Sequence, residues 1–130
     1  MNIKKCATIT ASAVIGLNRG YTNQTISTNE LKNAVQKIQI ELRDKRDLYL
    51  SVKITACEIL FLGQDEPSVT LDFIQYPKFQ YKEEKWKEAV LFFIEKIMDE
   101  LEQNRTVIIF PDTTFMLEKS ENIDPKIEKR

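Results

Sequence analysis

Apolar and polar residues alternate with two different periods along the chain. Near the N-terminus every second residue is apolar, which predicts a strand with one buried face. The buried residues of this strand are expected to be Ala7, Ile9, Ala11 and Ala13. Ser27 and Glu30 then stand at the spacing of a capping box, which predicts a helix that begins at Ser27 and ends near Asp44. The apolar stripe of this helix consists of Leu31, Ala34, Val35, Ile38 and Leu42.

The middle of the chain predicts a β-hairpin. From Leu48 the period returns to two, and the apolar run 59–62 extends this second strand, with its place in the core or at an interface left open. Residues 63–68 are mostly polar and include glycine and proline, so they predict the turn. The third strand follows, and its inward-facing residues are expected to be Val69, Leu71 and Phe73.

The second half of the chain predicts another helix and two short strands. Apolar residues return to helical spacing in a stripe that consists of Trp86, Ala89, Val90, Phe93, Ile94, Ile97, Met98 and Leu101. The β-branched run 105–110 predicts a strand, residues 111–114 a turn, and residues 115–118 a last short strand. The charged segment 119–130 predicts a disordered tail, which leaves residues 1–118 as a single domain.

This order of elements is that of the split βαβ unit. We predict an α+β fold in which an antiparallel sheet carries two helices on one face, in the ferredoxin-like βαββαβ layout with an extra short C-terminal strand. The face under the helices is expected to bury alternate residues of each strand. Beyond the N-terminal strand, these are Leu50, Val52, Ile54, Val69, Leu71, Phe73, Val107 and Ile109.

The opposite face of the predicted sheet combines apolar and polar residues, a composition typical of subunit interfaces. Its residues are expected to be Thr8, Thr10, Ser12, Tyr49, Ser51, Thr55, Thr70, Ile74, Tyr76, Thr106, Ile108 and Phe110. This pattern favours a homo-oligomer. The alternative is an ordinary half-polar exposed face, because threonine is a good strand former.

Composition and charge exclude several classes of function. The 130 residues fit one domain, and 19 basic against 20 acidic residues disfavour a nucleic-acid polymer as partner, because the chain has no general attraction for phosphates. Histidine is absent, which excludes Ser-His and Cys-His catalysis and histidine-ligated metals. No apolar run approaches the roughly 18 residues of a membrane span. We therefore expect no membrane partner and a cytoplasmic location.

The cysteines and the N-terminus have ordinary structural explanations. Cys6 and Cys57 stand far apart without a CxxC partner, so both are expected to be reduced and to serve packing rather than catalysis. The basic start and the small residues after it are also found in signal peptides. The regular alternation that follows favours the strand.

Candidate catalytic and metal-binding groups are sparse. The carboxylates that could hold Mg²⁺, if the fold brought several together, are Glu58, Asp65, Glu66, Asp72 and Asp112. Several of them fall in predicted turns, where acidic residues are favoured for their own local hydrogen bonds. The chain has no glycine-rich phosphate loop, no zinc motif and no nucleophile elbow. We therefore predict no catalytic residue, no cofactor and no metal.

Arginines and aromatic residues share the predicted loops. Arg19 and Tyr21 follow the first strand, and Tyr76 and Phe79 follow the third. Arg105 opens the fourth strand. Arginine binds phosphate through two parallel hydrogen bonds and an aromatic ring stacks on a base, so these residues predict a pocket for a small nucleotide-derived ligand. The alternative is structural, with the aromatic residues capping the core and Arg105 complementing the end of the second helix.

Three segments in these regions carry a family resemblance: GLNRGYT (16–22), GQDEPSVTLDFIQYPKF (63–79) and NRTVIIFPDTTFMLE (104–118). They resemble the small phage-encoded Thoeris anti-defence proteins, which sequester cyclic ADP-ribose-type signals without cutting them. The resemblance implies an oligomer with ligand pockets at subunit boundaries, where arginine and aromatic side chains hold a cyclic nucleotide. The candidates for those roles are Arg19, Arg105, Phe79 and Tyr76.

These observations together predict a non-enzymatic binding protein that sequesters a cyclic ADP-ribose-like signalling molecule and so blocks a bacterial immune response. Two alternatives from other classes stay open. One is a small dimeric ferredoxin-like enzyme acting on a hydrophobic substrate between helices and sheet, with Glu58 or Asp72 as acid or base. The other is a protein-interaction module whose threonine-rich face binds another protein.

Overall fold

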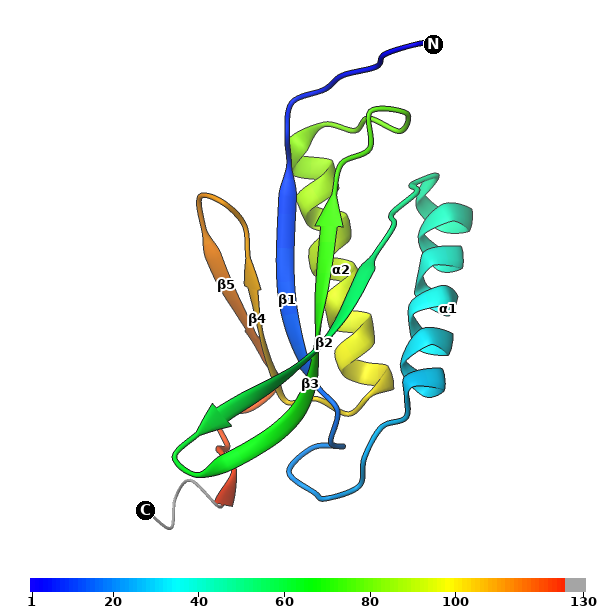
Figure 1. Ribbon diagram of the computed structural model, residues 1–130. Coiled ribbons are helices and arrows are strands. Elements are labelled where there is room, and N and C mark those ends of the chain that lie inside the picture. Colours follow the sequence, from blue (N-terminus) through cyan, green and yellow to red (C-terminus); the bar gives the residue numbers. More distant parts are fainter. Residues whose placement is uncertain (126–130) are drawn as a thin grey trace.

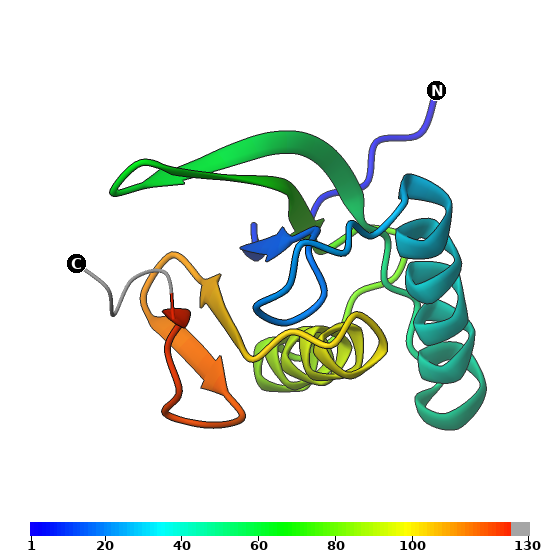
Figure 2. The same cartoon turned by 90° about the horizontal axis from the view of Figure 1, so that it is seen from below.

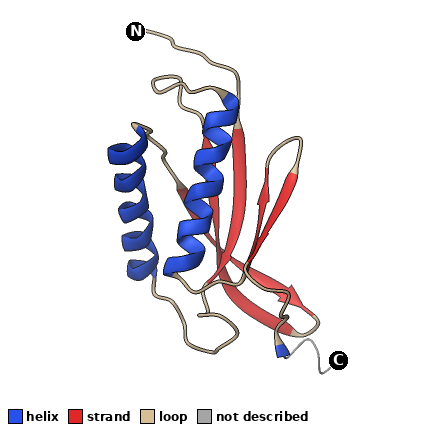
Figure 3. Ribbon diagram, turned by 180° about the vertical axis from the view of Figure 1, so that it is seen from behind, coloured by secondary structure: helices blue, strands red, loops and turns tan. Residues whose placement is uncertain are grey.

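Two helices cover one face of a five-stranded antiparallel sheet, and the other face is open (Figures 1 and 3). The computed structural model describes residues 1–125. Its elements are β1 (Thr10–Gly16), α1 (Thr28–Arg46), β2 (Lys53–Phe61), β3 (Gln64–Ile74), α2 (Glu83–Glu100), β4 (Arg105–Ile109) and β5 (Thr114–Glu118). The strands lie in the order β2-β3-β1-β4-β5. This confirms the predicted α+β fold and its ferredoxin-like layout with an extra C-terminal strand.

Both helices lie where the sequence predicts them. The side-chain oxygen of Ser27 accepts a hydrogen bond of 3.1 Å from the backbone N–H of Glu30, so Ser27 is the N-cap of α1. The carboxylate of Glu30 pairs with Arg19 instead of completing the capping box. The helix ends at Arg46, because Asp47 takes the left-handed backbone conformation with φ 48°.

The core lies between the helices and the covered face of the sheet. The helices bury their predicted stripes, which are Leu31, Ala34, Val35, Ile38 and Leu42 on α1 and Trp86, Ala89, Val90, Phe93, Ile94, Ile97 and Met98 on α2. From the sheet, Phe73 packs edge to face against Phe93 with ring centroids 5.3 Å apart. Full burial of such a side chain stabilises the fold by about 1.5–3 kcal/mol.

Two strands begin later than the sequence predicts. β1 begins at Thr10 and Ala7 is exposed, although the predicted inward positions from Ile9 onward are buried. β2 begins at Lys53 rather than at Leu48, and residues 48–52 run alongside the core outside the strand ladder. Alternation of apolar residues shows which face of the chain is buried. It does not show where a neighbouring strand is present to pair with it.

The hairpin turn is shorter than predicted. It consists of Leu62 and Gly63, both with positive φ (50° and 82°), as in a type I′ turn. Residues 64–68, predicted as the turn, are paired with β2, and Gln64 lies opposite Phe61. The hairpin projects beyond the helices (Figure 1), and most of its residues from Glu58 to Pro67 are exposed, whereas Ser68 is buried. The polar stretch 64–68 therefore belongs to strand β3 and not to a turn.

The two faces of β4 are the reverse of the prediction. Val107 and Ile109, expected in the core, are 41% and 52% exposed. Thr106, Ile108 and Phe110, expected on the open face, are buried. Residues 107–110 are all apolar, so their pattern does not show which of them face the core, and a shift of one residue exchanges the two faces of the strand.

The predicted disordered tail, 119–130, is described only in part. The backbone carbonyl of Asn122 accepts hydrogen bonds from the side chains of Tyr21 and Arg105. Residues 126–130 lie outside the described residues, so the predicted division after residue 118 stays a prediction. Within the described chain, no helix is both long and apolar enough to cross a membrane.

The open face of the sheet carries exposed apolar side chains from four strands. They are Val14, Ile74, Val107, Ile109 and Met116, and we call them the open-face patch. Contiguous apolar side chains on a surface mark interaction sites more often than isolated ones do.

Candidate active site

A hollow is lined by the β2–β3 hairpin, the β1–α1 loop, residues 103–105 at the start of β4, and Asp124. The hairpin and the β4–β5 pair extend toward the same side of the molecule (Figure 2). The hollow consists of two adjoining cavities of about 290 and 200 Å³. Both are lined by Gly20, Tyr21, Gln64, Glu66 and Asp124. The other lining residues are Asn18, Thr22, Ile59, Phe61, Gly63, Asp65, Gln103, Asn104 and Arg105. We call this site the hairpin hollow.

Gly16, at the end of β1, leaves the space that the Glu66 carboxylate occupies in the hairpin hollow. Strand pairing places Gly16 opposite Ser68, and a Cβ atom on Gly16 would collide with the carboxylate of Glu66. The same Cβ atom would lie 3.2 Å from Oε1 of Gln103. The backbone of Gly16 is ordinary strand, so glycine is needed here for space and not for backbone conformation.

Gln64 places a buried amide nitrogen in the wall of the hollow. Within the described part of the chain, its Nε2 atom is inaccessible to water and has no hydrogen-bond partner. A buried polar group without a partner is uncommon and costs stability. This amide therefore marks a point at which a ligand or a partner could supply the missing acceptor.

A hydrogen-bond network fixes the opposite wall. Nδ2 of Asn104 donates to Oη of Tyr21 at 3.0 Å, and that hydroxyl donates to the carbonyl of Asn122 at 2.9 Å. Arg105 donates to the same carbonyl at 3.1 Å and pairs with Glu118 at 2.5 Å. The hydrogen bond to Glu118 is the main reason that the pKa of Arg105 is raised. The ring of Tyr21 and the guanidinium of Arg105 are thus held in place by the protein itself.

Carboxylates outnumber cations among the described residues that line the hairpin hollow. These carboxylates are Asp65, Glu66 and Asp124. Arg105 is the one guanidinium among its described lining residues, and Glu118 already neutralises it. Because opposite charges attract, this lining favours a cationic ligand over a phosphate.

Three of the five site residues predicted from the sequence lie at this end of the molecule. Tyr21 and Arg105 line the hairpin hollow together. Arg19 lies beside it in the β1–α1 loop, where it pairs with Glu30 and, at 3.0 Å, with Glu102. Both arginines are therefore bound to carboxylates of the chain itself.

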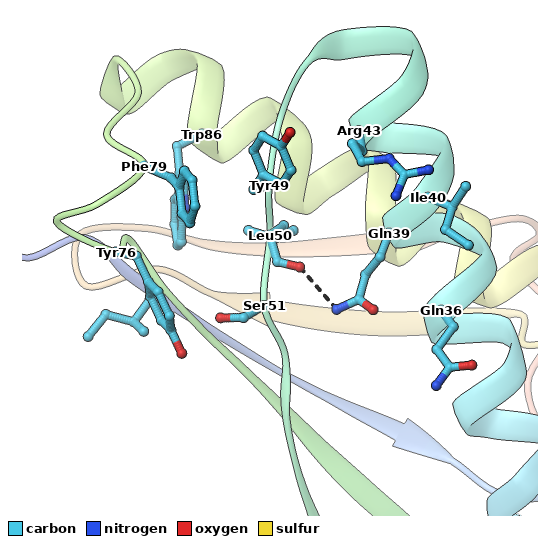
Figure 4. Close-up of a pocket in the computed structure, with 11 residues that line it drawn as sticks. Gln36, Gln39, Ile40, Arg43, Tyr49, Leu50, Ser51, Tyr76, Phe79 and Trp86 are labelled. Atoms are coloured by element: carbon cyan, nitrogen blue, oxygen red, sulfur yellow. Dashed lines mark hydrogen bonds between the residues drawn. The ribbon is translucent and has the colours of Figure 1, made fainter.

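The other two predicted site residues, Tyr76 and Phe79, lie at the opposite end of the sheet. They line a separate cavity between α1, the segment that leads into β2, and the loop after β3 (Figure 4). The structure does not bring these rings together with Arg19, Tyr21 or Arg105.

The two carboxylates considered for acid–base catalysis lie elsewhere. Glu58 is exposed on β2 opposite Pro67, and Asp72 lies on β3 opposite Lys53. The space between helices and sheet, where a hydrophobic substrate was expected, is filled by the apolar core. Over residues 1–125, no three acidic or cysteine side chains are grouped so as to hold a metal ion.

Solved structures relate this fold to an enzyme. A phage SAM lyase in the apo state has a TM-score of 0.69 and 16% identity, with 88% of this chain and 91% of that chain covered. A phage SAM lyase in complex with S-methyl-5′-thioadenosine has a TM-score of 0.67 and 15% identity, with 95% and 98% covered. By sequence, the chain matches no protein-family model and no protein of curated function. At such identities, the likeness shows that the fold is shared.

The non-enzymatic function predicted from the sequence is contradicted by this finding. These two structures, which share the fold along almost the whole chain, are of a lyase and not of a protein that sequesters a cyclic ADP-ribose-like signal. The alternative of a small ferredoxin-like enzyme fits better. The sequence also predicted, more generally, a small nucleotide-derived ligand. One of the two lyase structures contains such a ligand, S-methyl-5′-thioadenosine.

Sequence reasoning missed Gly16 and Gln64 and considered Glu66 only as a magnesium ligand. Glu66 was assigned to a turn, so nothing indicated that its side chain shares a face with the hollow. The polar stretch 64–68, which lies between apolar strand residues, was the one feature of the sequence that could have pointed to a polar site at Glu66. The unpartnered amide and the close approach at Gly16 depend on strand pairing, which the sequence does not display.

Proposed function

We propose that this chain is a lyase that cleaves S-adenosylmethionine and releases S-methyl-5′-thioadenosine. The observation that carries the proposal is the acidic hairpin hollow, where the Glu66 carboxylate lies against Gly16. Two SAM lyase structures that share the fold over nearly the whole chain support it. The substrate is a sulfonium cation, which Asp65, Glu66 and Asp124 would attract.

The reaction breaks one of the three bonds to sulfur. Methylthioadenosine keeps the methyl group and the adenosyl carbon, so the bond that breaks joins sulfur to Cγ of the aminobutyrate chain. Both electrons of this bond go to sulfur, which becomes a neutral thioether. The substrate's own carboxylate can attack Cγ as sulfur leaves, which closes a five-membered lactone. This route balances without water and without a protein base, so it suits a chain that has no histidine.

On this route the protein contributes position rather than proton transfer. The carboxylate and Cγ must meet within a folded substrate, and well-oriented intramolecular reactions gain as much as about 7–11 kcal/mol from such positioning. We assign to Glu66 the binding of the substrate's positive charge. The Nε2 amide of Gln64 donates to an acceptor of the substrate, and the ring of Tyr21 offers a stacking surface for adenine.

The active form in this proposal is a homo-oligomer. The open-face patch consists of exposed apolar side chains, which a second copy of the chain would cover. The patch and the hairpin hollow lie at the open side of the sheet, so one contact between copies would also shield the hollow from water.

The biological role in this proposal is removal of a metabolite rather than capture of a signal. S-adenosylmethionine is the methyl donor of cells, so a phage protein that destroys it in the host cytoplasm would deprive methylation-dependent defence of its substrate. This retains the anti-defence role suggested by the resemblance and changes its chemistry.

Product analysis tests the proposed function. Purified protein is incubated with S-adenosylmethionine in water enriched in oxygen-18, and early products are identified by mass spectrometry. We expect methylthioadenosine together with a lactone that contains no oxygen-18. Recovery of unchanged substrate, or a first product that carries oxygen-18, would contradict the proposal.

A further inference from the structure

Another cavity lies away from the hairpin hollow, beside the start of β2. Its volume is about 470 Å³, which is within the range of small-molecule sites. Aromatic rings form much of its wall: Tyr49, Tyr76 and Phe79 stand around it, and Trp86 lies at its floor, 1% exposed (Figure 4). We call it the aromatic cavity.

Hydrogen bonds and ring contacts hold the walls of the aromatic cavity in place. Nε2 of Gln39, on α1, donates to the carbonyl of Leu50 at 3.0 Å (Figure 4). The rings of Tyr49 and Phe79 stack with centroids 4.9 Å apart. The backbone N–H of Tyr49 donates to the hydroxyl of Tyr81 at 2.7 Å. The cavity is therefore formed before any ligand enters, which lowers the entropic cost of binding.

Polar groups with unused hydrogen-bonding capacity line the same cavity. In the described part of the chain, no hydrogen bond is made by the hydroxyls of Tyr49, Ser51 and Tyr76 or by the side chain of Gln36. Arg43 lines the cavity, and only its Nε atom is engaged, at 2.8 Å from Asp44. An apolar wall with a few polar groups at its rim is typical of a ligand site.

The charge of the lining restricts what this cavity can bind. Asp44 pairs with Nε of Arg43, so the two terminal amino groups of this guanidinium stay available for an anion. No carboxylate is among the described residues that line the cavity. We propose that the aromatic cavity binds a planar aromatic acid, with the ring system beside Tyr49, Tyr76 and Phe79 and the anionic group hydrogen-bonded to Arg43. A sulfonium or ammonium ligand is disfavoured here, in contrast to the hairpin hollow. The inference does not depend on the proposed lyase activity.

The single tryptophan makes the test specific to this site. Trp86 is the one tryptophan of the chain, so ¹⁵N-labelled protein gives one indole N–H signal, and that signal reports from the cavity floor. The probes are 2-naphthoate, 2-naphthamide and 2-naphthylmethylammonium, which share one ring system and differ in charge. We expect 2-naphthoate to shift the Trp86 signal saturably and to bind at least about tenfold more tightly than the ammonium probe.

Variants separate the site from general hydrophobic binding. Ser51→Phe places a ring in the cavity and should abolish the shift, whereas Thr55→Phe, an exposed change on β2 outside the cavity, should leave it intact. Arg43→Gln should reduce the affinity for 2-naphthoate to that for 2-naphthamide. The proposal is overturned if 2-naphthoate gives no saturable shift, if the shift survives in the Ser51→Phe protein, or if the ammonium probe binds as tightly.

Discussion

At the scale of single residues, the position of the Glu66 carboxylate depends on the absence of a side chain at Gly16. Gly16→Ala adds one methyl group where the carboxylate now lies, and the flexible Glu66 side chain must move away. We expect methylthioadenosine formation to fall by about tenfold or more, because small displacements of a binding group are costly in catalysis. The melting temperature should change little, since the backbone of Gly16 is ordinary strand. Unchanged turnover in this variant would remove Glu66 from the site.

A second residue-scale prediction concerns pH and the helix surface. Nζ of Lys45 lies 2.9 Å from Oε1 of Glu41, and this hydrogen bond lowers the pKa of Glu41 below its ordinary value of 4.5. The folded state therefore binds this proton less readily than the unfolded state. The stabilisation is present above about pH 4.5 and is lost as the pH falls through the lowered pKa.

Thermal unfolding of the Glu41→Gln protein checks this pH dependence. The substitution should lower the melting temperature slightly near pH 7, and this loss should shrink as the pH falls through the lowered pKa of Glu41. A loss that stays equal as the pH falls would show that the contribution of Glu41 is not that of its charge.

At the scale of elements, β4 offers a matched pair of substitutions. Ile108 is fully buried and its neighbour Ile109 is 52% exposed. Ile108→Ala should lower the free energy of unfolding by about 3 kcal/mol, because it removes packed atoms and leaves a cavity. Ile109→Ala should change it by less than about 1 kcal/mol. Chemical denaturation, at concentrations where the chain is monomeric, measures the free energy of unfolding of both variants. A larger loss for Ile109→Ala would show that Ile109 faces the core, as the sequence predicted.

The elements that the sequence predicts best are those with signals at their ends. Ser27 caps α1 as expected because its hydrogen bond is to a residue three positions away. The faces of β4 and the turn at Leu62 and Gly63 depend on pairing with other strands, and local pattern does not determine that pairing.

The same limit applies to the candidate site. The sequence shows that Arg19 and Arg105 stand beside aromatic residues, but it does not show that Glu102 and Glu118 bind them. Arg19 and Glu102 are 83 positions apart in the chain. The type of residue could therefore be predicted, and its charge partner could not. That missing partner is why a phosphate pocket was expected where the structure has an acidic hollow.

At the scale of the whole molecule, the open-face patch predicts self-association. Light scattering should give the mass of an oligomer for the native chain at micromolar concentration. The double change Val107→Lys with Ile109→Lys places two like charges on exposed positions of β4 and should give a monomer that stays folded. A native chain that is monomeric under these conditions would contradict the proposed homo-oligomer.

The central claim, that the hairpin hollow cleaves S-adenosylmethionine, is tested most directly by comparing two glutamate variants of one hairpin. The measurement is the initial rate of methylthioadenosine release by the native chain, by Glu66→Gln and by Glu58→Gln. Glu58 is exposed on β2 and does not line the hollow, so its substitution should leave the rate within about twofold. Loss of the Glu66 charge should lower the rate by about a hundredfold. No release by the native chain, or equal rates for both variants, would contradict the account.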